Sequence, residues 1–233
     1  MRTAGSRAGA RLLRARLGAD QAQSVRVVPL PVDLQRFRPR LQRERRKAIA
    51  EGEAPARLLC VADLNPVKDH ATLLEAFGLL ARSRPHARLD LVGGGPCLGE
   101  LRRQAATLGI AERVRWWGQV PHEAVHLAYA EADAFVLASR HEGQGIALLE
   151  AAACALPIAT TPVGIAPELP AGSVHYAPSR DVGALAQAMA AALDDAPRDK
   201  DARRALRSAV RQRWSPRASA ARVSKLWREL GHA

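Results

Sequence analysis

Two glutamates separated by seven residues mark the stretch of this sequence in which residue types and spacing best suit chemistry. Glu142 is followed by Gly143 and Gly145, and Glu150 lies in an alanine-rich segment that predicts a helix starting near Gly145. Glycines let a ligand approach the backbone, and a helix start favours an anion such as phosphate. A carboxylate on each side of a phosphate site suits a sugar nucleotide. Taken alone, the glutamates would more simply be solvated side chains of a strand–loop–helix segment.

Two basic residues are expected beside such a site. Lys68 stands on the loop between a predicted strand and a predicted helix, where an ammonium group can reach a diphosphate and neutralise charge as it leaves a sugar. The alternative for Lys68 is a solvated lysine at a helix start. Arg140 closely precedes Glu142 and can contact phosphate or pair with an acid.

The elements that must position these residues alternate regularly from residue 57 onward. Strands are expected at residues 57–62, 88–92, 113–117, 134–137, directly after Pro157, and 173–176. Helices are expected at 70–83, 99–108, 122–131, from about 145, 181–193, 198–213 and 215–230. This alternation predicts an α/β fold, a Rossmann-like parallel sheet with helices on both faces, whose ligands bind at the carboxyl ends of the strands.

The context of the two glutamates is more specific than their spacing. Residues 139–157 run Ser-Arg-x-Glu-Gly-x-Gly, then an apolar stretch, Glu-Ala-x-Ala-Cys and a proline. This string resembles the Glu-x7-Glu signature of the family-4 retaining glycosyltransferases, which have the two-domain GT-B architecture. The resemblance covers nearly the whole chain after residue 24. It implies transfer of a hexose from a UDP- or GDP-sugar to an acceptor hydroxyl with retention, with no cofactor and no metal in the diphosphate site.

The resemblance also implies roles for individual residues. Glu142 and Lys68 are the expected catalytic residues, with Glu142 on the hexose and Glu150 on the ribose hydroxyls. The expected donor-binding residues are Asp63, Lys68, Gly93, Gly95, Val120, Arg140, Glu142, Gly143, Gln144, Gly145, Ile146 and Glu150. Val120 is included because, in relatives, the backbone at the end of its strand receives the nucleobase.

One position departs from the family pattern. Asp63 stands five residues before Lys68, where the family has an arginine that contacts the diphosphate. A carboxylate there would repel phosphate, which places affinity and activity in question. Asp63 can instead cap its loop or bind a neighbouring arginine.

The glycines at 93, 94, 95 and 99 invite a dinucleotide interpretation. Their spacing is one residue too long for Gly-x-Gly-x-x-Gly, and they follow the second strand of the unit rather than the first. Nicotinamide or flavin binding is therefore disfavoured. The loop resembles the family's Val-Gly-x-Gly-Pro turn beside the donor, and a tight turn that needs positive φ is compatible with that.

Three parts of the chain are expected: residues 1–40 as a remnant of an N-terminal domain with its linker, 41–213 as the nucleotide-sugar-binding domain, and 214–233 as a crossover helix. Residues 1–23 are expected to form a helix, 24–31 a β-branched run, and 42–56 a loop or short helix. The chain thus resembles the donor half alone, and the acceptor domain would come from a partner chain. An exposed apolar face on the last helix, formed by Val223, Leu226, Trp227 and Leu230, would favour association, including with a second copy.

Composition excludes several classes. The 233 residues are 48% apolar and 25% charged, typical of a globular protein, and they include no apolar stretch of membrane-spanning length. No apolar segment near Met1 indicates a signal peptide, so none is expected. The three cysteines lack metal-ligand spacing and are read as buried apolar residues in a reducing compartment, so a cytoplasmic location is expected.

The net charge of +12 is concentrated at the two ends of the chain. It suits an anionic substrate or a peripheral contact with the inner face of a membrane, or reflects a general arginine bias. Nucleic acid is disfavoured because no recognisable binding motif accompanies the charge.

Two other function classes stay open. The first is a non-catalytic or degenerate nucleotide-sugar-binding module, or one chain of a split transferase, which Asp63 and the short front end favour. The second keeps the architecture but changes the reaction, to a sugar-nucleotide epimerase or a phosphorylase, whose further active-site groups are not found in the sequence.

Overall fold

The computed structural model describes residues 2–39, 51, 54–198, 200–229 and 231, and its larger part is built on a six-stranded sheet. The strands are β3 (Arg57–Val61), β4 (Arg88–Val92), β5 (Val114–Gly118), β6 (Ala134–Leu137), β7 (Ile158–Thr160) and β8 (Val174–Tyr176). Their order is β5-β4-β3-β6-β7-β8, and every neighbouring pair is parallel.

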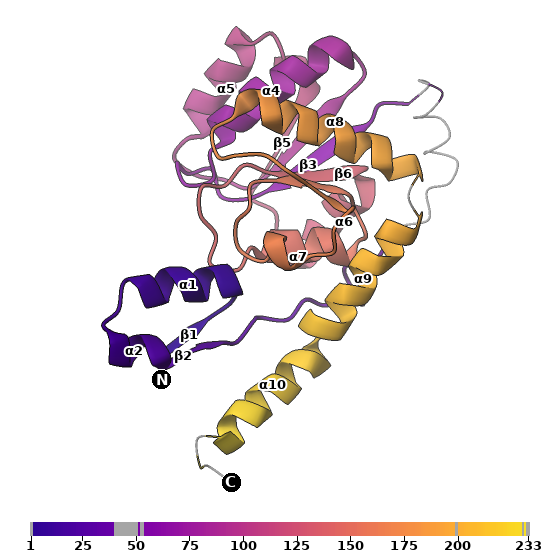
Figure 1. The fold of residues 1–233 in the computed structure, drawn as a ribbon. Coiled ribbons are helices and arrows are strands. Elements are labelled where there is room, and N and C mark those ends of the chain that lie inside the picture. Colours follow the sequence, from indigo (N-terminus) through magenta and orange to yellow (C-terminus); the bar gives the residue numbers. More distant parts are fainter. Residues whose placement is uncertain (1, 40–50, 52–53, 199, 230, 232–233) are drawn as a thin grey trace.

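Helices connect these strands and cover both faces of the sheet. They are α4 (His70–Ser83), α5 (Leu98–Thr107), α6 (His122–Glu131), α7 (Ile146–Ala153) and α8 (Val182–Arg198), with short 3-10 turns η1 (Ala111–Arg113) and η2 (Ala166–Glu168). Figure 1 shows α4, α5 and α8 on one face and α6 and α7 on the other. The predicted Rossmann-like α/β fold is confirmed, and α8 continues beyond its expected end to Arg198.

The core follows from the apolar pattern of these elements. All four side chains of β6 are buried, as expected for a central strand that helices cover on both sides. In α4, Leu73, Phe77 and Leu80 recur at helical spacing and are buried as predicted. Each such side chain stabilises the fold by about 1.5–3 kcal/mol.

The chain reverses its order in the sheet between β3 and β6. The first strands run outward from β3 to β5, and the chain then returns to place β6 on the other side of β3. Loops leave such a switch point in opposite directions and open a crevice at the carboxyl ends of the strands. The loop after β3 carries Lys68 and the loop after β6 carries Glu142, so the topology brings both to this crevice.

The prediction of one helix over residues 1–23 is wrong. The segment contains β1 (Arg2–Ala4), α1 (Arg7–Ala15) and α2 (Ala19–Gln23), and β1 pairs in parallel with β2 (Val25–Val27). The helix begins only after Ser6, whose extended backbone and side-chain hydrogen bond to the Gly9 N–H cap α1. We call residues 2–30 the N-terminal unit.

The chain ends in α9 (Lys200–Trp214) and α10 (Pro216–Glu229), which confirm the two closing helices expected there. The Val32 N–H donates to the Trp214 carbonyl at 2.9 Å, and the Ser219 hydroxyl donates to the Pro29 carbonyl at 3.2 Å. These bonds join α9 to residue 32 and α10 to the N-terminal unit. Figure 1 shows both helices close to the segment that follows β2.

The apolar face expected on the last helix is only partly described. Val223 and Trp227 of α10 are 47% and 60% exposed, and Leu226 is half-buried. Leu230 and most of the segment 42–56 lie outside the described residues. Whether this face mediates association, and the boundaries proposed at residues 40 and 213, stay predictions. No helix within the described ranges is long and apolar enough to span a bilayer.

Candidate functional site

A cavity of about 940 Å³ opens at the carboxyl ends of the strands around the switch point. The predicted site residues that line it are Asp63, Lys68, Gly93, Val120, Glu142, Gln144, Gly145 and Ile146. The other predicted site residues, Gly95, Arg140, Gly143 and Glu150, are not part of its lining. The loops after β3, β4, β5 and β6 therefore meet around one space.

Lys68 and Glu142 form an ion pair in this cavity. The Lys68 ammonium donates to Glu142 Oε1 at 2.6 Å, and the Ser139 hydroxyl donates to the same oxygen at 2.8 Å. The two charged side chains are only 21% and 11% exposed, so water screens their attraction less than it would at the surface. Ser139 and Lys68 thus hold the Glu142 carboxylate by one oxygen.

Asp63 also lines this cavity. The lining therefore carries one basic side chain, Lys68, and two acidic side chains, Asp63 and Glu142, among the described residues. Backbone N–H groups are the further source of positive potential that an anion would need here.

Arg140 braces two loops rather than lining the cavity. Its guanidinium donates to the Pro66 carbonyl, its Nε lies 4.0 Å from Asp69 Oδ2, and its backbone N–H donates to the Val67 carbonyl at 2.8 Å. The loop after β6 is in this way fastened to the loop after β3, which carries Lys68.

The glycine turn after β4 lies against the loop after β3. A Cβ added at Gly93 would lie 2.1 Å from the Ala62 carbonyl oxygen, and one at Gly95 would lie 2.5 Å from the Leu64 oxygen. Both glycines have positive φ, as the turn interpretation anticipated. Gly93 reaches the cavity, whereas Gly95 supports the turn from outside the lining.

Helix α7 begins at the cavity. Gly145 precedes it with φ 82° and ψ 67°, a left-handed conformation that favours glycine, and Ile146 and Ala147 line the cavity with the first turn. The Leu148 N–H donates to the Gly145 carbonyl at 3.0 Å, so the first amides of the helix, those of Ile146 and Ala147, are the ones suited to receive an anion.

Glu150 lies one turn further along α7 and is buried. The Tyr129 hydroxyl of α6 donates to Glu150 Oε2 at 2.8 Å and also contacts the Ala147 carbonyl at 3.2 Å. Burial raises the pKa of the Glu150 carboxyl, and the hydrogen bond from Tyr129 opposes that rise. Tyr129 is absent from the sequence-based site because no sequence spacing links it to Glu150.

The Gly143 carbonyl and the Gln144 side chain contact the N-terminal unit. The Gly143 carbonyl accepts from the Ser6 hydroxyl, and the Gln144 side chain pairs with the backbone of Leu30, which lines the cavity. Gln119 also lines the cavity, and the sequence-based site does not include it. It belongs to no recognisable motif, so only its place in the fold reveals that it reaches the cavity.

The described part of the chain has no cluster of three or more His, Cys, Asp or Glu side chains arranged to hold a metal ion.

Comparison with known proteins places this site in a family. Residues 42–213 match the protein family described as "Glycosyl transferases group 1". The GDP-mannose-dependent alpha-(1-6)-phosphatidylinositol monomannoside mannosyltransferase of Mycolicibacterium smegmatis is 32% identical over 229 residues, which cover 93% of this chain and 60% of that protein. The D-inositol 3-phosphate glycosyltransferase 2 of Catenulispora acidiphila is 35% identical over 215 residues, 87% of this chain and 50% of that protein.

Solved structures show the same fold. A sucrose-phosphate synthase from Thermosynechococcus elongatus matches with a TM-score of 0.81 and 25% identity, covering 98% of this chain and 57% of that one. The Anabaena protein HepE, solved in complex with UDP and glucose, matches with a TM-score of 0.80 and 19% identity, covering 97% and 62%. This chain thus spans about half to three fifths of the length of the proteins it resembles.

Proposed function

The chain belongs to the group 1 glycosyl transferases, and we propose that it forms the donor-binding part of a retaining, family-4 hexosyltransferase that uses a UDP- or GDP-sugar. The observation that carries this proposal is the Lys68–Glu142 pair at the switch point, beside the first turn of α7. A cation and free amides face one cavity with a carboxylate, which matches the charge and hydroxyl pattern of a sugar diphosphate.

Each group has a separate task in the proposed reaction. Lys68 and the first amides of α7 bind the diphosphate and stabilise its charge as the bond to the sugar breaks. Glu142, released from Lys68 when the diphosphate takes the ammonium group, holds the hexose near its transferred carbon. Glu150 binds the ribose hydroxyls. The family match favours transfer over the epimerase and phosphorylase alternatives.

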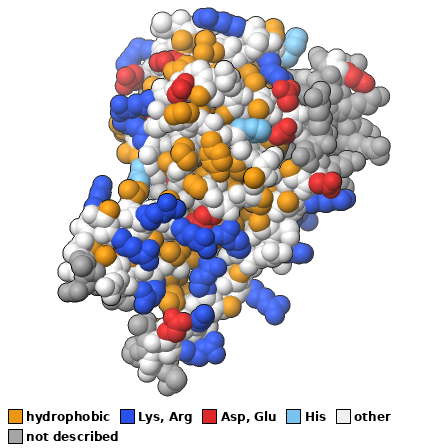
Figure 2. Space-filling view, in the orientation of Figure 1, with side chains coloured by type: hydrophobic (Ala, Val, Ile, Leu, Met, Phe, Trp, Pro, Cys, Tyr) orange, Lys and Arg blue, Asp and Glu red, His pale blue; other side chains and the backbone are white. Residues whose placement is uncertain are grey.

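The acceptor side is proposed to come from another chain or from a second copy. The Mycolicibacterium relative is named for GDP-mannose as its donor, so GDP and GDP-mannose are the first ligands to test. Figure 2 shows Lys and Arg side chains gathered over the N-terminal unit and the closing helices. We propose that this basic surface permits a peripheral contact with an anionic membrane from the cytoplasmic side.

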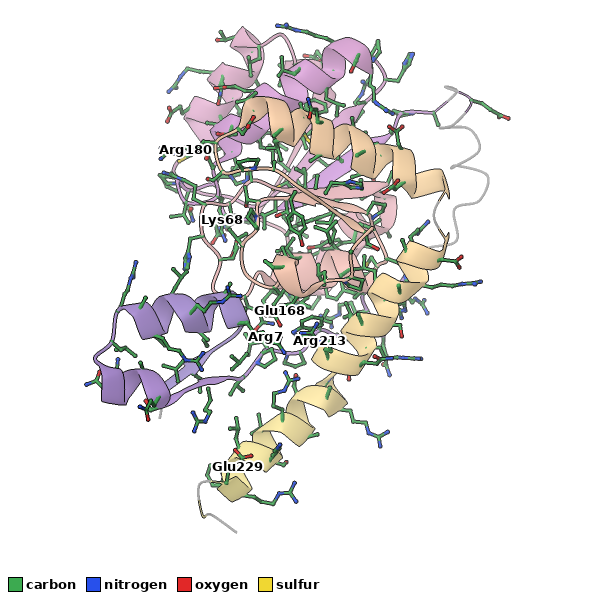
Figure 3. All side chains as sticks on the ribbon, in the orientation of Figure 1. Arg7, Lys68, Glu168, Arg180, Arg213 and Glu229 are labelled. Atoms are coloured by element: carbon green, nitrogen blue, oxygen red, sulfur yellow. The ribbon has the colours of Figure 1, made fainter. Side chains whose placement is uncertain are left out.

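Calorimetric titration of GDP and UDP into the purified chain tests the donor site. We expect dissociation constants between micromolar and millimolar, which correspond to a favourable binding free energy of about 4–8 kcal/mol. Lys68→Ala and Glu150→Ala should each weaken binding about tenfold or more, because each removes a hydrogen bond to a charged group worth about 1.5–3 kcal/mol. Arg180→Ala is the control, since Arg180 is an exposed basic residue after β8 that does not line the cavity (Figure 3). Equal affinities for all four proteins would contradict the proposal.

A degenerate binding module is the second candidate, and Asp63 favours it. The carboxylate lines the cavity where the diphosphate is proposed to bind. If the folded chain binds neither nucleotide, Asp63→Arg should restore binding. Tight nucleotide binding by the wild-type chain, which carries Asp63, would remove the main support for a degenerate binding module.

A further inference from the structure

We propose that Ser6 and Gln144 are positioning residues that hold the glycine loop 142–145 in place for the donor, so that the donor site depends on the N-terminal unit. This inference rests on the proposed function for its effect on nucleotide affinity. It assigns a role to Ser6 and Leu30, which lie outside the segment 42–213 that matches the family.

Ser6 uses one hydroxyl for two purposes. Its oxygen accepts from the Gly9 N–H at 3.0 Å, which caps α1, and its proton is donated to the Gly143 carbonyl at 2.6 Å. A hydroxyl can donate once and accept twice, so both bonds form together. The residue is 1% exposed, and water therefore cannot replace either partner.

Gln144 binds the N-terminal unit as a backbone peptide group would. Its Oε1 accepts from the Leu30 N–H at 2.7 Å, and its Nε2 donates to the Leu30 carbonyl at 2.8 Å. Both ends of the amide have complementary partners, so its orientation is determined. The residue is 7% exposed.

Two glycines let the N-terminal unit come this close. A Cβ at Gly5 would lie 2.6 Å from Gln144 Oε1, and one at Gly9 would lie 2.8 Å from the Gly143 carbonyl oxygen. Neither glycine has positive φ, so closeness to the loop, and not backbone conformation, is what excludes a side chain here.

The loop is held from its other side as well. The Ile165 N–H donates to the Gln144 carbonyl at 2.9 Å, and a Cβ at Gly164 would lie 2.3 Å from that oxygen. The loop is therefore enclosed between the N-terminal unit and the segment after β7. Glu142 and Gly145 flank the held residues directly, and misplacing such groups by about 1 Å can cost roughly a hundredfold in function.

Variants of the full chain separate the loop contacts from helix capping. Ser6→Asp keeps an acceptor for the Gly9 N–H but loses the donor to Gly143, whereas Ser6→Thr keeps both. Gln144→Glu keeps the acceptor for Leu30 and loses the donor. Ser215→Ala is the control, because Ser215 accepts from the Ala218 N–H at the start of α10, far from the loop in sequence.

We expect Ser6→Asp and Gln144→Glu to weaken GDP binding at least tenfold, with Ser6→Thr within about threefold of wild type and Ser215→Ala unchanged. Hydrogen exchange at the amides of Leu148 and Leu149, which donate to the Gly145 carbonyl, and of Ile165, which donates to the Gln144 carbonyl, should accelerate about tenfold in the first two variants alone. Thermal unfolding verifies that each variant is folded. Exchange and affinity equal to wild type in folded Ser6→Asp and Gln144→Glu would overturn the inference. If wild type binds no nucleotide, the proposed function fails, while exchange still decides whether these residues hold the loop.

Discussion

His70 and Glu150 are titratable side chains buried next to the candidate site. His70 begins α4, two residues after Lys68, and its Nε2 lies 3.7 Å from Cys60 Sγ. Burial first, and then the nearby Lys68 charge, lower the pKa of His70 from 6.5 to about 4. A protonated His70 would thus add a second positive charge in the interior behind Lys68, at a cost to stability.

Acid should therefore destabilise the protein through His70. The unfolded chain binds a proton near pH 6.5 and the folded chain only near pH 4, so the stability that the neutral side chain contributes is complete above 6.5 and lost as the pH falls through about 4. The loss amounts to about 3 kcal/mol. Denaturant unfolding at pH 7 and pH 4 should show the free-energy difference between wild type and His70→Gln shrinking by roughly that amount. Parallel pH profiles would contradict this assignment.

Tyr129→Phe should weaken GDP binding about three- to tenfold. The hydroxyl it removes donates to Glu150 Oε2, and a hydrogen bond of this kind contributes about 0.5–1.5 kcal/mol. If Glu150 binds the ribose hydroxyls, Tyr129→Phe should reduce the affinity for 2′-deoxy-GDP less than it reduces the affinity for GDP. Calorimetry on both ligands measures this difference. Tyr176→Phe is the matched control, because the Tyr176 hydroxyl donates to the Ala166 carbonyl. An equal loss for both ligands would place Tyr129 outside ribose recognition.

Two glycines in the loops after β7 and before β8 resist substitution for different physical reasons. Gly172 needs only a left-handed backbone, since its φ is 84° and a Cβ would meet nothing within 4 Å. Gly164 has φ 56° and also lies against the Gln144 carbonyl. Comparing substitutions at the two glycines therefore separates the effect of the contact with Gln144 from the effect of the left-handed backbone.

Gly164→Ala should therefore destabilise the protein more than Gly172→Ala. The left-handed conformation costs about 1–2 kcal/mol in either variant. Only Gly164→Ala must also displace Gln144, so its additional cost should come with weaker GDP binding. Denaturant unfolding and calorimetry on both variants measure this. Equal stabilities with equal GDP affinities would show that the loop moves freely.

Elements with local sequence patterns were predictable, and contacts between distant segments were not. Phe77 and its neighbours recur at helical spacing, and the loops carrying Lys68 and Glu142 follow strands whose carboxyl ends must share one edge. Arg2–Ala4 has no such pattern, because only pairing with Val25–Val27 makes it a strand. Gln144 likewise offered no signal for its bonds to Leu30, which lies 114 residues away.

Across the whole molecule, Glu168 joins three parts of the chain. It accepts from the backbone N–H of Arg7 at 2.9 Å and from the Arg213 guanidinium at 2.8 Å, while its own position is at the end of η2. Figure 3 shows these three residues meeting between α1 and α9. The Glu168 side chain is 12% exposed, so this carboxylate is screened less than a surface one.

Glu168→Gln should lower the free energy of unfolding by about 1–2 kcal/mol, because it removes the charge that pairs with Arg213. The ion pair with the Arg7 side chain adds little, because that side chain is largely exposed to water. For a chain of this size, the expected loss corresponds to a fall in Tm of roughly 2–8 °C. Glu229→Gln is the control, because Glu229 pairs with Lys225 at 3.9 Å on the exposed face of α10. Equal Tm values for the two variants would rule out a stabilising role for the Glu168 junction.

The peptide-like pairing of Gln144 with Leu30 also bears on how such proteins can be recombined. A chimaera that exchanges residues 42–213 between relatives would separate the glycine loop from the serine, the glycines and the backbone segment that enclose it. A crossover placed before Gly5 would transfer both sides of the contact together. Grafts of donor preference should therefore succeed more often when the first thirty residues travel with the sheet that follows them.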